Sequence, residues 1–383
     1  AKNIAEKCRV IEEAQHSELK YVHDLHMFQQ VFSARIRIWL EQSNNKELVN
    51  KLKKSDQDLH ALLTCYHELE CLHHAVEKDL QDRLAIWGPT QLISDIFSKL
   101  YSAFSVYKTF MQHYNQSIVA LDTCIADAGH PTMQALDLLY YLRIPIGRLA
   151  IYAQTLQQLI RFSDPSHPDY GPLVRVTDKF NQMATEWRAT LHDCHSHLLV
   201  LEAAHHIQFC PMTVTPSRRL VLHGTLLRVD VEDLSNADDF RTYVLYNDGL
   251  IFCRKVKEKK ESKLQFKGTV NLTFAKVRLL SPQLCTKMME ARRTALSTFR
   301  IKKTAKKGSG EPPASPQEIF GFELITNEVC MDAMMLPFNH SFSIANGPAN
   351  IQRRHILRCS SFAEQSAWIE AIKKVLHSLH NQK

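Results

Sequence analysis

The first half of the chain carries a helical pattern of apolar positions. From Glu6 to about Phe209, apolar residues recur at three- and four-residue steps, and glycine is rare. This spacing is typical of amphipathic helices that bury one face. After the first helix the runs are 48–78, 92–126, 132–162 and 173–207, separated by short breaks. The pattern therefore predicts an all-α elongated helical bundle of about five or six long helices.

The first helix shows the clearest apolar stripe. Its members are Ile11, Ala14, Tyr21, Leu25, Phe28 and Phe32. The helical spacing is complete only when position 18 is included, and that residue is Glu18. A carboxylate that interrupts an apolar stripe is either a solvated helix residue or a functional group, and both interpretations stay open at this point.

The pattern changes after the segment 210–217, which has a proline near each end. From Leu220 the apolar runs are short, rich in β-branched and aromatic residues, and separated by turn residues such as Asn247-Asp248-Gly249. The candidate strands are 220–227, 242–246, 249–254, 268–274, 276–280, 320–326, 341–344 and 355–359. Consecutive strands with tight turns predict an antiparallel meander.

A last helix follows these strands. Ser361 and Glu364 have the spacing of a capping box at its start. Its apolar face consists of Trp368, Ile372, Val375, Leu376 and Leu379. The second half of the chain is therefore predicted to be a β-barrel with a C-terminal helix.

The length of 383 residues fits two domains, each large enough to bury a core. We expect a helical domain at 1–209, a linker at 210–219 and a β-domain at 220–383. Within the β-domain the segment 304–316 is polar and rich in Pro, Gly and Ser. It is too poor in apolar residues to pack, so we expect a flexible insertion between strands.

Composition narrows the class of protein. The chain is 45% hydrophobic and 23% charged, and no apolar run approaches the length that spans a bilayer. The first residues show no signal-peptide pattern and no initiator Met, so we expect a fragment of a longer protein. Ten scattered cysteines without a Cys-x-x-Cys pair suit a reduced, cytoplasmic protein. The net charge of +7 favours acidic lipid surfaces or an acidic partner.

Motifs of conventional enzyme chemistry are missing from the sequence. There is no Gly-rich phosphate loop and no motif of nucleophilic catalysis. The most metal-like cluster contains His192, His195 and His197, but only the first two share a helix face, and no second ligand pair has a matching spacing. We interpret these as incidental surface histidines and expect no metal and no cofactor. Basic-aromatic motifs for nucleic acid are also missing.

The predicted barrel with a Trp368-bearing helix resembles a pleckstrin-homology domain. In the helical half, Val10–Leu25 resembles the opening helix of Dbl-homology domains, with the match at Glu18, Tyr21, Val22 and Leu25. Segment 92–100 with Tyr107 and Tyr114-Asn115 is similar to the second motif block of that family. Segment 142–152 is similar to the third, and 167–170 fits the loop that follows. This order resembles the tandem of guanine-nucleotide exchange factors for Rho-family GTPases.

The resemblance implies a partner of the Rho, Rac or Cdc42 type and exchange without covalent chemistry or a cofactor. The helical domain would grip the GTPase switches so that GDP leaves. Glu18 would engage the first switch as a charge-assisted anchor. Arg148, Ile151 and Arg188 would complete the GTPase surface, although Arg148 also has a structural interpretation.

Two of these positions depart from the family pattern. Ile151 stands where the third block normally has a basic residue, and Arg188 stands near a position that is usually Asn or Asp. Gly147 also replaces the usual Gln. A second hypothesis therefore stays open, in which the chain is a non-catalytic, GTPase-binding or membrane-proximal scaffold.

Lipid binding by the second domain would depend on cations beside the first hairpin. Arg228 and Arg241 flank an acidic segment, 230–239, which would repel an inositol phosphate. The basic run after Cys253 gives a weaker alternative, attraction to anionic membrane at about 1 kcal/mol per charge. Its candidates are Lys255, Lys257, Lys259 and Lys260. The basic residues after Cys253 are explained equally well as solvated loop residues that keep the domain soluble. Peripheral recruitment of the protein to membrane stays an expectation.

Overall fold

The computed structural model describes residues 2–43, 49–88, 90–128, 135–230, 232–234, 238–258, 261–291, 318–329 and 350–381. The chain divides into two compact units. One comprises Ala1–His205 with Met212–Ser217, and the other comprises His206–Pro211 with Arg218–Lys383. None of the described helices is long and apolar enough to cross a membrane.

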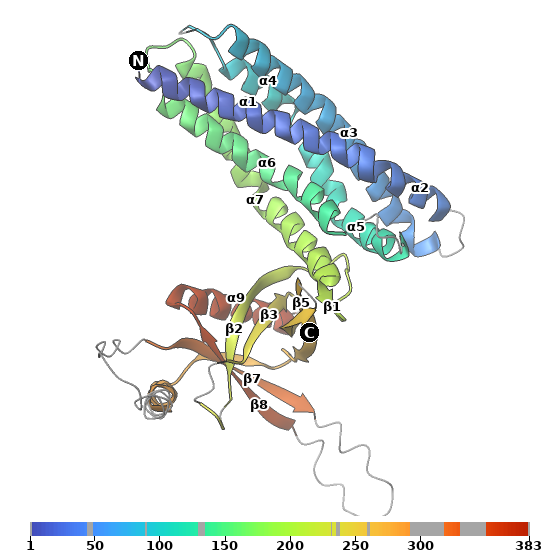
Figure 1. Ribbon diagram of the computed structural model, residues 1–383, viewed down its shortest axis with the longest axis vertical. Helices are drawn as coiled ribbons and strands as arrows, with labels where there is room; N and C mark the ends of the chain where they lie inside the picture. Colours follow the sequence, from blue (N-terminus) through green and yellow to red (C-terminus); the bar gives the residue numbers. More distant parts are fainter. Residues whose placement is uncertain are drawn as a thin grey trace, which may run out of the picture. The chain divides into compact units, whose positions relative to one another are not determined.

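The first unit is a bundle of long helices (Figure 1), as the apolar spacing predicts. The elements are α1 (Lys2–Phe28), η1 (Gln29–Ser33, one π-helical turn), α2 (Ala34–Ser43), α3 (Val49–Ala85), α4 (Ser94–Ala103), α5 (Ser105–Ala128), α6 (Ala135–Arg161) and α7 (Tyr170–His206). Helix α1 packs against α3 and α6, and α3 packs against α5. The stripe on α1 is buried along its length, because Ile11, Leu25 and Phe28 are almost fully covered.

The run predicted as one helix over 92–126 is broken in the structure at Phe104. This residue ends α4, and its N–H bonds to the Tyr101 carbonyl at 3.2 Å, which tightens the last turn. The Phe104 ring is 1% exposed and stacks on Tyr107 at 4.3 Å between ring centroids. The apolar spacing continues across the break, so it could not reveal where one helix ends.

Asp169 fixes the start of α4 from the segment before α7. Its carboxylate accepts hydrogen bonds from the backbone N–H groups of Ile93, at 3.0 Å, and Ser94, at 3.2 Å, and from the Ser94 hydroxyl. These N–H groups have no partner inside the helix, so the carboxylate caps it. Asp169 is fully buried, and two segments far apart in the sequence are thereby joined.

The second unit is an eight-stranded sheet with the C-terminal helix α9 (Phe362–Asn381). The strands are β1 (Ile207–Gln208), β2 (Leu220–Val229), β3 (Phe240–Tyr246), β4 (Leu250–Glu258), β5 (Glu261–Val270), β6 (Lys276–Leu279), β7 (Phe320–Val329) and β8 (Asn350–Cys359). Their order is β1-β5-β4-β3-β2-β8-β7-β6, antiparallel except for the short β1–β5 pair. This confirms the predicted sheet with a C-terminal helix (Figure 1).

Trp368 anchors α9 on the sheet. It is 2% exposed and stacks on Phe322 of β7 at 6.4 Å between ring centroids. The predicted cap is present, because the Glu364 N–H donates to the Ser361 hydroxyl at 3.2 Å, and the Glu364 carboxylate accepts from the N–H of Ser360, one residue before the cap. The helix therefore begins where the sequence pattern predicts.

Some predicted strand boundaries are wrong. The expected strand at 268–274 is the end of β5, which begins at Glu261, pairs with β4 and stops at Val270. Phe274 has a positive φ of 59°, which interrupts extended backbone. Residues 282–291 are helical, which the pattern did not predict. The predicted strand at 341–344 and the predicted insertion at 304–316 lie outside the described residues.

Candidate functional site

Helices α6 and α7 form a surface strip that contains two of the predicted site residues. Arg143 of α6 donates to Glu202 of α7 at 2.6 Å, and Gln157 of α6 donates to Asn181 of α7 at 3.4 Å. Residue numbers increase along α6 but decrease along α7 from the first contact to the second, so the two helices are antiparallel. Ile151 on α6 and Arg188 on α7 both lie between these two contacts. We call the stretch between the contacts the α6–α7 strip.

The middle of the α6–α7 strip contains two small residues on α6, Gly147 and Ala150. Its exposed residues on that helix include Gly147, Ala150, Ile151 and Gln154. Ile151 is 41% exposed. A Cβ atom added at Gly147 would meet no other atom within 4 Å, so the space beside it is open. Arg188 is exposed and contributes the positive charge on α7. The strip can therefore receive another backbone or a large side chain at close range.

Glu18 and Arg148 do not lie on this surface. Glu18 is 1% exposed and Arg148 is 3% exposed. The Arg148 guanidinium donates to the Glu18 carboxylate at 2.7 Å and to the Ser17 hydroxyl at 2.8 Å. It also donates to the Tyr152 hydroxyl at 2.9 Å, and Tyr152 in turn donates to Glu18. An ion pair thus joins α1 and α6 inside the bundle.

His73 of α3 extends the ion pair into a network. Its Nδ1 lies 3.2 Å from the Glu18 carboxylate, and its Nε2 lies 2.8 Å from the Tyr107 hydroxyl of α5. The Tyr107 and Tyr21 hydroxyls are 3.0 Å apart. We call this set the buried network: Ser17, Glu18, Tyr21, His73, Tyr107, Arg148 and Tyr152. It connects α1, α3, α5 and α6.

The electrostatics of the buried network favour a charged pair and a neutral imidazole. Burial by itself would raise the pKa of Glu18, but His73, Arg148 and the bond from Tyr152 outweigh it and lower the pKa to about 2. Burial lowers the pKa of His73, and the nearby Glu18 only partly offsets this. Burial would lower the pKa of Arg148, yet Tyr152 and Glu18 raise it, so the guanidinium stays charged.

These positions correct the expectation that Glu18 and Arg148 form exposed surface. The helical spacing puts position 18 on the packed face of α1, and the Arg148 cation compensates its charge there. The structural interpretation of Arg148 fits its burial. Direct contact between Glu18 and a GTPase stays a prediction, and it requires the buried network to open. Sequence reasoning missed His73, which is one of 20 histidines and lies 55 residues from Glu18 in the chain.

The buried network predicts loss of stability in acid. The folded pKa of Glu18 lies below its ordinary value of 4.5, so its contribution is present above that pH and is lost as pH falls towards 2. Each pKa unit is worth about 1.4 kcal/mol. The lowered pKa of His73 also reduces stability in acid, starting at about its ordinary value of 6.5. Below that pH the unfolded state binds a proton at His73 more readily than the folded state does.

Urea unfolding at several pH values checks this. We expect Glu18→Gln to be less stable at neutral pH and to lose less stability in acid than the parent. The exposed control Glu12→Gln should follow the parent at every pH. Parallel pH profiles for Glu18→Gln and the parent would contradict the assigned ionisation of Glu18.

In the second unit, the Asp239 carboxylate lies close to three arginine side chains. Asp239 lies 2.8 Å from Arg241, 2.6 Å from Arg254 and 3.5 Å from Arg228. Burial would raise the pKa of Asp239, but the hydrogen bonds and charges of Arg241 and Arg254 outweigh it and lower that pKa. The cluster therefore keeps an excess of positive charge. Arg241 also lies over the ring of Phe252 at 4.9 Å, which fixes its orientation.

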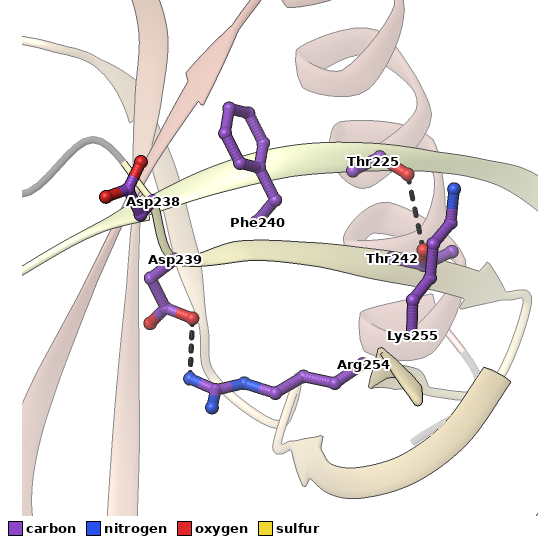
Figure 2. Close-up of a pocket in the computed structure, with 7 residues that line it drawn as sticks. All are labelled: Thr225, Asp238, Asp239, Phe240, Thr242, Arg254 and Lys255. Carbon is purple, nitrogen blue, oxygen red and sulfur yellow. Dashed lines mark hydrogen bonds and ion pairs between the residues drawn. The ribbon is translucent and has the colours of Figure 1, made fainter. Parts of the chain in front are cut away.

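A pocket of about 620 Å³ lies beside this cluster, and Figure 2 shows the residues that line it. The lining residues are Thr225, Asp238, Asp239, Phe240, Thr242, Arg254 and Lys255. Lys255 and Lys257 are exposed on β4, two residues apart, and so on the same side of the strand. Lys259 and Lys260 lie outside the described residues. The structure thus brings four of the six predicted lipid-site residues to the β2–β3–β4 region.

Two histidines of the candidate cluster on α7 have protein partners. His192 lies 3.4 Å from the Ser196 hydroxyl, and His197 lies 3.2 Å from the Asn115 amide oxygen. Within the described residues there is no group of three or more His, Cys, Asp or Glu side chains that could hold a metal ion.

Comparison with known protein families gives two matches in chain order. A model described as the RhoGEF domain matches residues 10–187. A model described as the SOS1/NGEF-like PH domain matches residues 214–375. Together the matches include the buried network, the part of the α6–α7 strip that ends at Trp187, and most of the sheet unit.

Characterised proteins are similar to parts of the chain. Guanine exchange factor for Rac 30 of Dictyostelium discoideum is 27% identical over 213 residues, which are 52% of this chain and 12% of that protein. Ras-specific guanine nucleotide-releasing factor 2 of Rattus norvegicus is 20% identical over 60% of this chain and 20% of its own length. The chain spans less than a third of the length of either relative.

Among solved structures, the DH/PH domains of PDZ-RhoGEF in complex with GTP-γ-S activated RhoA are 14% identical in sequence. The similarity covers 99% of this chain and 95% of that chain, with a TM-score of 0.43.

Proposed function

The chain is a RhoGEF domain followed by a PH domain, and from this premise we propose that it is a guanine-nucleotide exchange factor for a Rho-family GTPase. The observation that carries the proposal is the open α6–α7 strip, which lies on helices of the RhoGEF match and has room for a partner. Relatives whose names describe guanine exchange support the same activity.

The proposed mechanism uses differential binding only. The α6–α7 strip binds the switch segments in the shape they take without nucleotide, so GDP leaves because that state is stabilised. Ile151 supplies an apolar contact and Arg188 a cation, while the buried network holds α1 and α6 in register beneath the surface. No bond is made or broken by the exchange factor.

The alternative is a scaffold that binds a GTPase without promoting exchange. Ile151 favours it, because an isoleucine cannot form the ion pair that a basic side chain would make. Two measurements separate the hypotheses: release of fluorescent GDP from Rho, Rac and Cdc42, and capture of the same GTPases in nucleotide-free form. Capture without faster release identifies a scaffold. Neither capture nor release for any of the three GTPases would refute both.

We also propose that the protein is cytoplasmic and that its PH domain recruits it peripherally to anionic membrane. The arginines around Asp239, with Lys255 and Lys257 nearby, give a net positive surface. Each cation near an anionic bilayer contributes about 1 kcal/mol, so attraction is weak and sensitive to salt. Asp239 and Asp238 oppose a tightly held inositol phosphate.

Asp239→Asn tests this surface. Removing the carboxylate that neutralises the cluster is expected to raise affinity for vesicles containing phosphatidylserine by about fivefold, corresponding to about 1 kcal/mol. Cosedimentation at low salt measures it. The matched control is Asp248→Asn, which removes a carboxylate paired with Arg218 at 2.8 Å in another turn of the domain. Equal gains in both variants would mean that only net charge matters, and no gain in Asp239→Asn would rule out this membrane surface.

A further inference from the structure

A second pocket lies at the end of the helical bundle where α1 begins. Its volume is about 720 Å³, and its walls come from α1, from the segment after α3 and from the connection between α6 and α7. Much of the wall is apolar and includes Ile4, Trp87, Phe162, Pro165 and Pro168. The α6–α7 strip does not share these residues, so the exchange surface does not explain the pocket.

One wall of this pocket contains a buried cation. Lys7 is only 7% exposed, and among the described residues it makes no hydrogen bond or ion pair. Burial lowers its pKa, and the negative charge of Asp169 offsets this only in part. Both oxygens of Asp169 already accept bonds from Ile93 and Ser94. The Lys7 side chain is thus largely withdrawn from water and its ammonium group has no acceptor in the protein, which is costly, so the site favours an anionic ligand.

A second donor in the pocket wall is also unpaired. The indole Nε1–H of Trp87 is buried and has no hydrogen-bond partner among the described residues. An indole N–H can only donate, so its complement is an acceptor oxygen. Two unpaired donors, one on α1 and one in the segment after α3, thus line one largely apolar pocket. Pockets of this size with a few polar groups are typical of ligand sites.

We propose that this pocket binds a carboxylate carried on an apolar body, namely an acidic residue in a peptide segment with apolar neighbours. Lys7 would meet the carboxylate, and the ring of Trp87 would pack against the apolar part. A phosphate dianion fits less well. The pocket offers one cation, and Asp164 on its wall is ionised, because hydrogen bonds from Ser166 hold its pKa below the ordinary value.

Titration of the full chain with blocked tripeptides tests the proposal. The chain is labelled with 5-fluorotryptophan, and the Trp87 resonance is assigned by Trp87→Phe. The probes are acetyl-Leu-Glu-Leu-amide, with a side-chain carboxylate, acetyl-Leu-Gln-Leu with a free terminal carboxylate, and the neutral acetyl-Leu-Gln-Leu-amide. We expect the Glu peptide to shift the Trp87 signal saturably, with about tenfold higher affinity than the neutral peptide.

Two variants make the test specific. Lys7→Met keeps a long side chain, removes the unpaired cation and is therefore expected to fold with an unchanged or higher melting temperature. It should abolish the preference for the Glu peptide, whereas Lys20→Met, an exposed position on the same helix, should retain it. Equal affinity for acidic and neutral peptides, or a preference that survives Lys7→Met, would overturn the proposal. Tighter binding of the terminal carboxylate would instead overturn the assignment to an internal acidic residue.

Discussion

Replacing Glu18 by Ala is expected to lower the free energy of unfolding of the helical unit by about 3–5 kcal/mol. The substitution leaves the Arg148 guanidinium buried without its carboxylate and removes an acceptor for Tyr152 and His73. Arg148→Ala should cost a similar amount, because it leaves the Glu18 carboxylate unpaired. These are the largest stability effects that we expect in the bundle.

Urea unfolding followed by helical circular dichroism measures both losses. The double variant Glu18→Ala/Arg148→Ala should lose less than the sum of the single losses, since the two side chains share one interaction. Glu12→Ala, exposed on the same helix, is the control and should change stability by less than about 0.5 kcal/mol. A loss below about 1 kcal/mol in Glu18→Ala would contradict the buried network.

Because Glu18 is buried, a substitution there can reduce exchange by unfolding the helical unit. Lost exchange in Glu18→Ala cannot be assigned to a missing GTPase contact until the variant is shown to be folded. Surface substitutions on the α6–α7 strip separate the two effects, because they leave the buried network intact.

Gly147→Trp is expected to abolish exchange while the protein stays folded. A Cβ atom added at Gly147 meets open space and the position is exposed, so we expect a larger side chain to extend into solvent without rearranging the bundle. The same side chain would occupy the space that a docked GTPase needs, and we expect release of GDP to fall by at least about a hundredfold. Tryptophan also removes a helical glycine, which offsets any small loss in stability.

Two control variants accompany Gly147→Trp. Gly147→Ala should keep exchange near the parent level and raise stability by about 0.5–1 kcal/mol, since alanine is a better helix former. Glu68→Trp puts the same bulk on an exposed position of α3 and should not alter exchange. Exchange that survives Gly147→Trp in a folded protein would place the GTPase elsewhere on the molecule.

The fold was largely predictable because each half keeps one hydrophobic period over a long stretch. The stripe from Ile11 to Phe32 predicts the packed face of α1, and the Ser361–Glu364 pair predicts the start of α9. The break at Phe104 was not predictable, since the ring is apolar and in register with its neighbours. It results from tertiary packing, which the local pattern does not contain.

The candidate site was predictable only in part. The helical spacing of the apolar stripe predicts that Glu18 is buried, whereas its charge predicts that it is exposed to solvent. The conflict is resolved by Arg148, which is 130 residues away in the chain, and by His73. Such partners leave no local signal. Ile151 and Arg188 are exposed and accessible to a partner, and their contact with a GTPase remains a prediction.

Exchange through the α6–α7 strip is tested most directly by the release of fluorescent GDP from Rho, Rac and Cdc42 in the presence of the chain and of its Gly147→Trp variant. We expect the chain to accelerate release from at least one of the three GTPases and the folded variant not to do so. No acceleration for any of them, or equal acceleration by the chain and the variant, would contradict exchange through this strip.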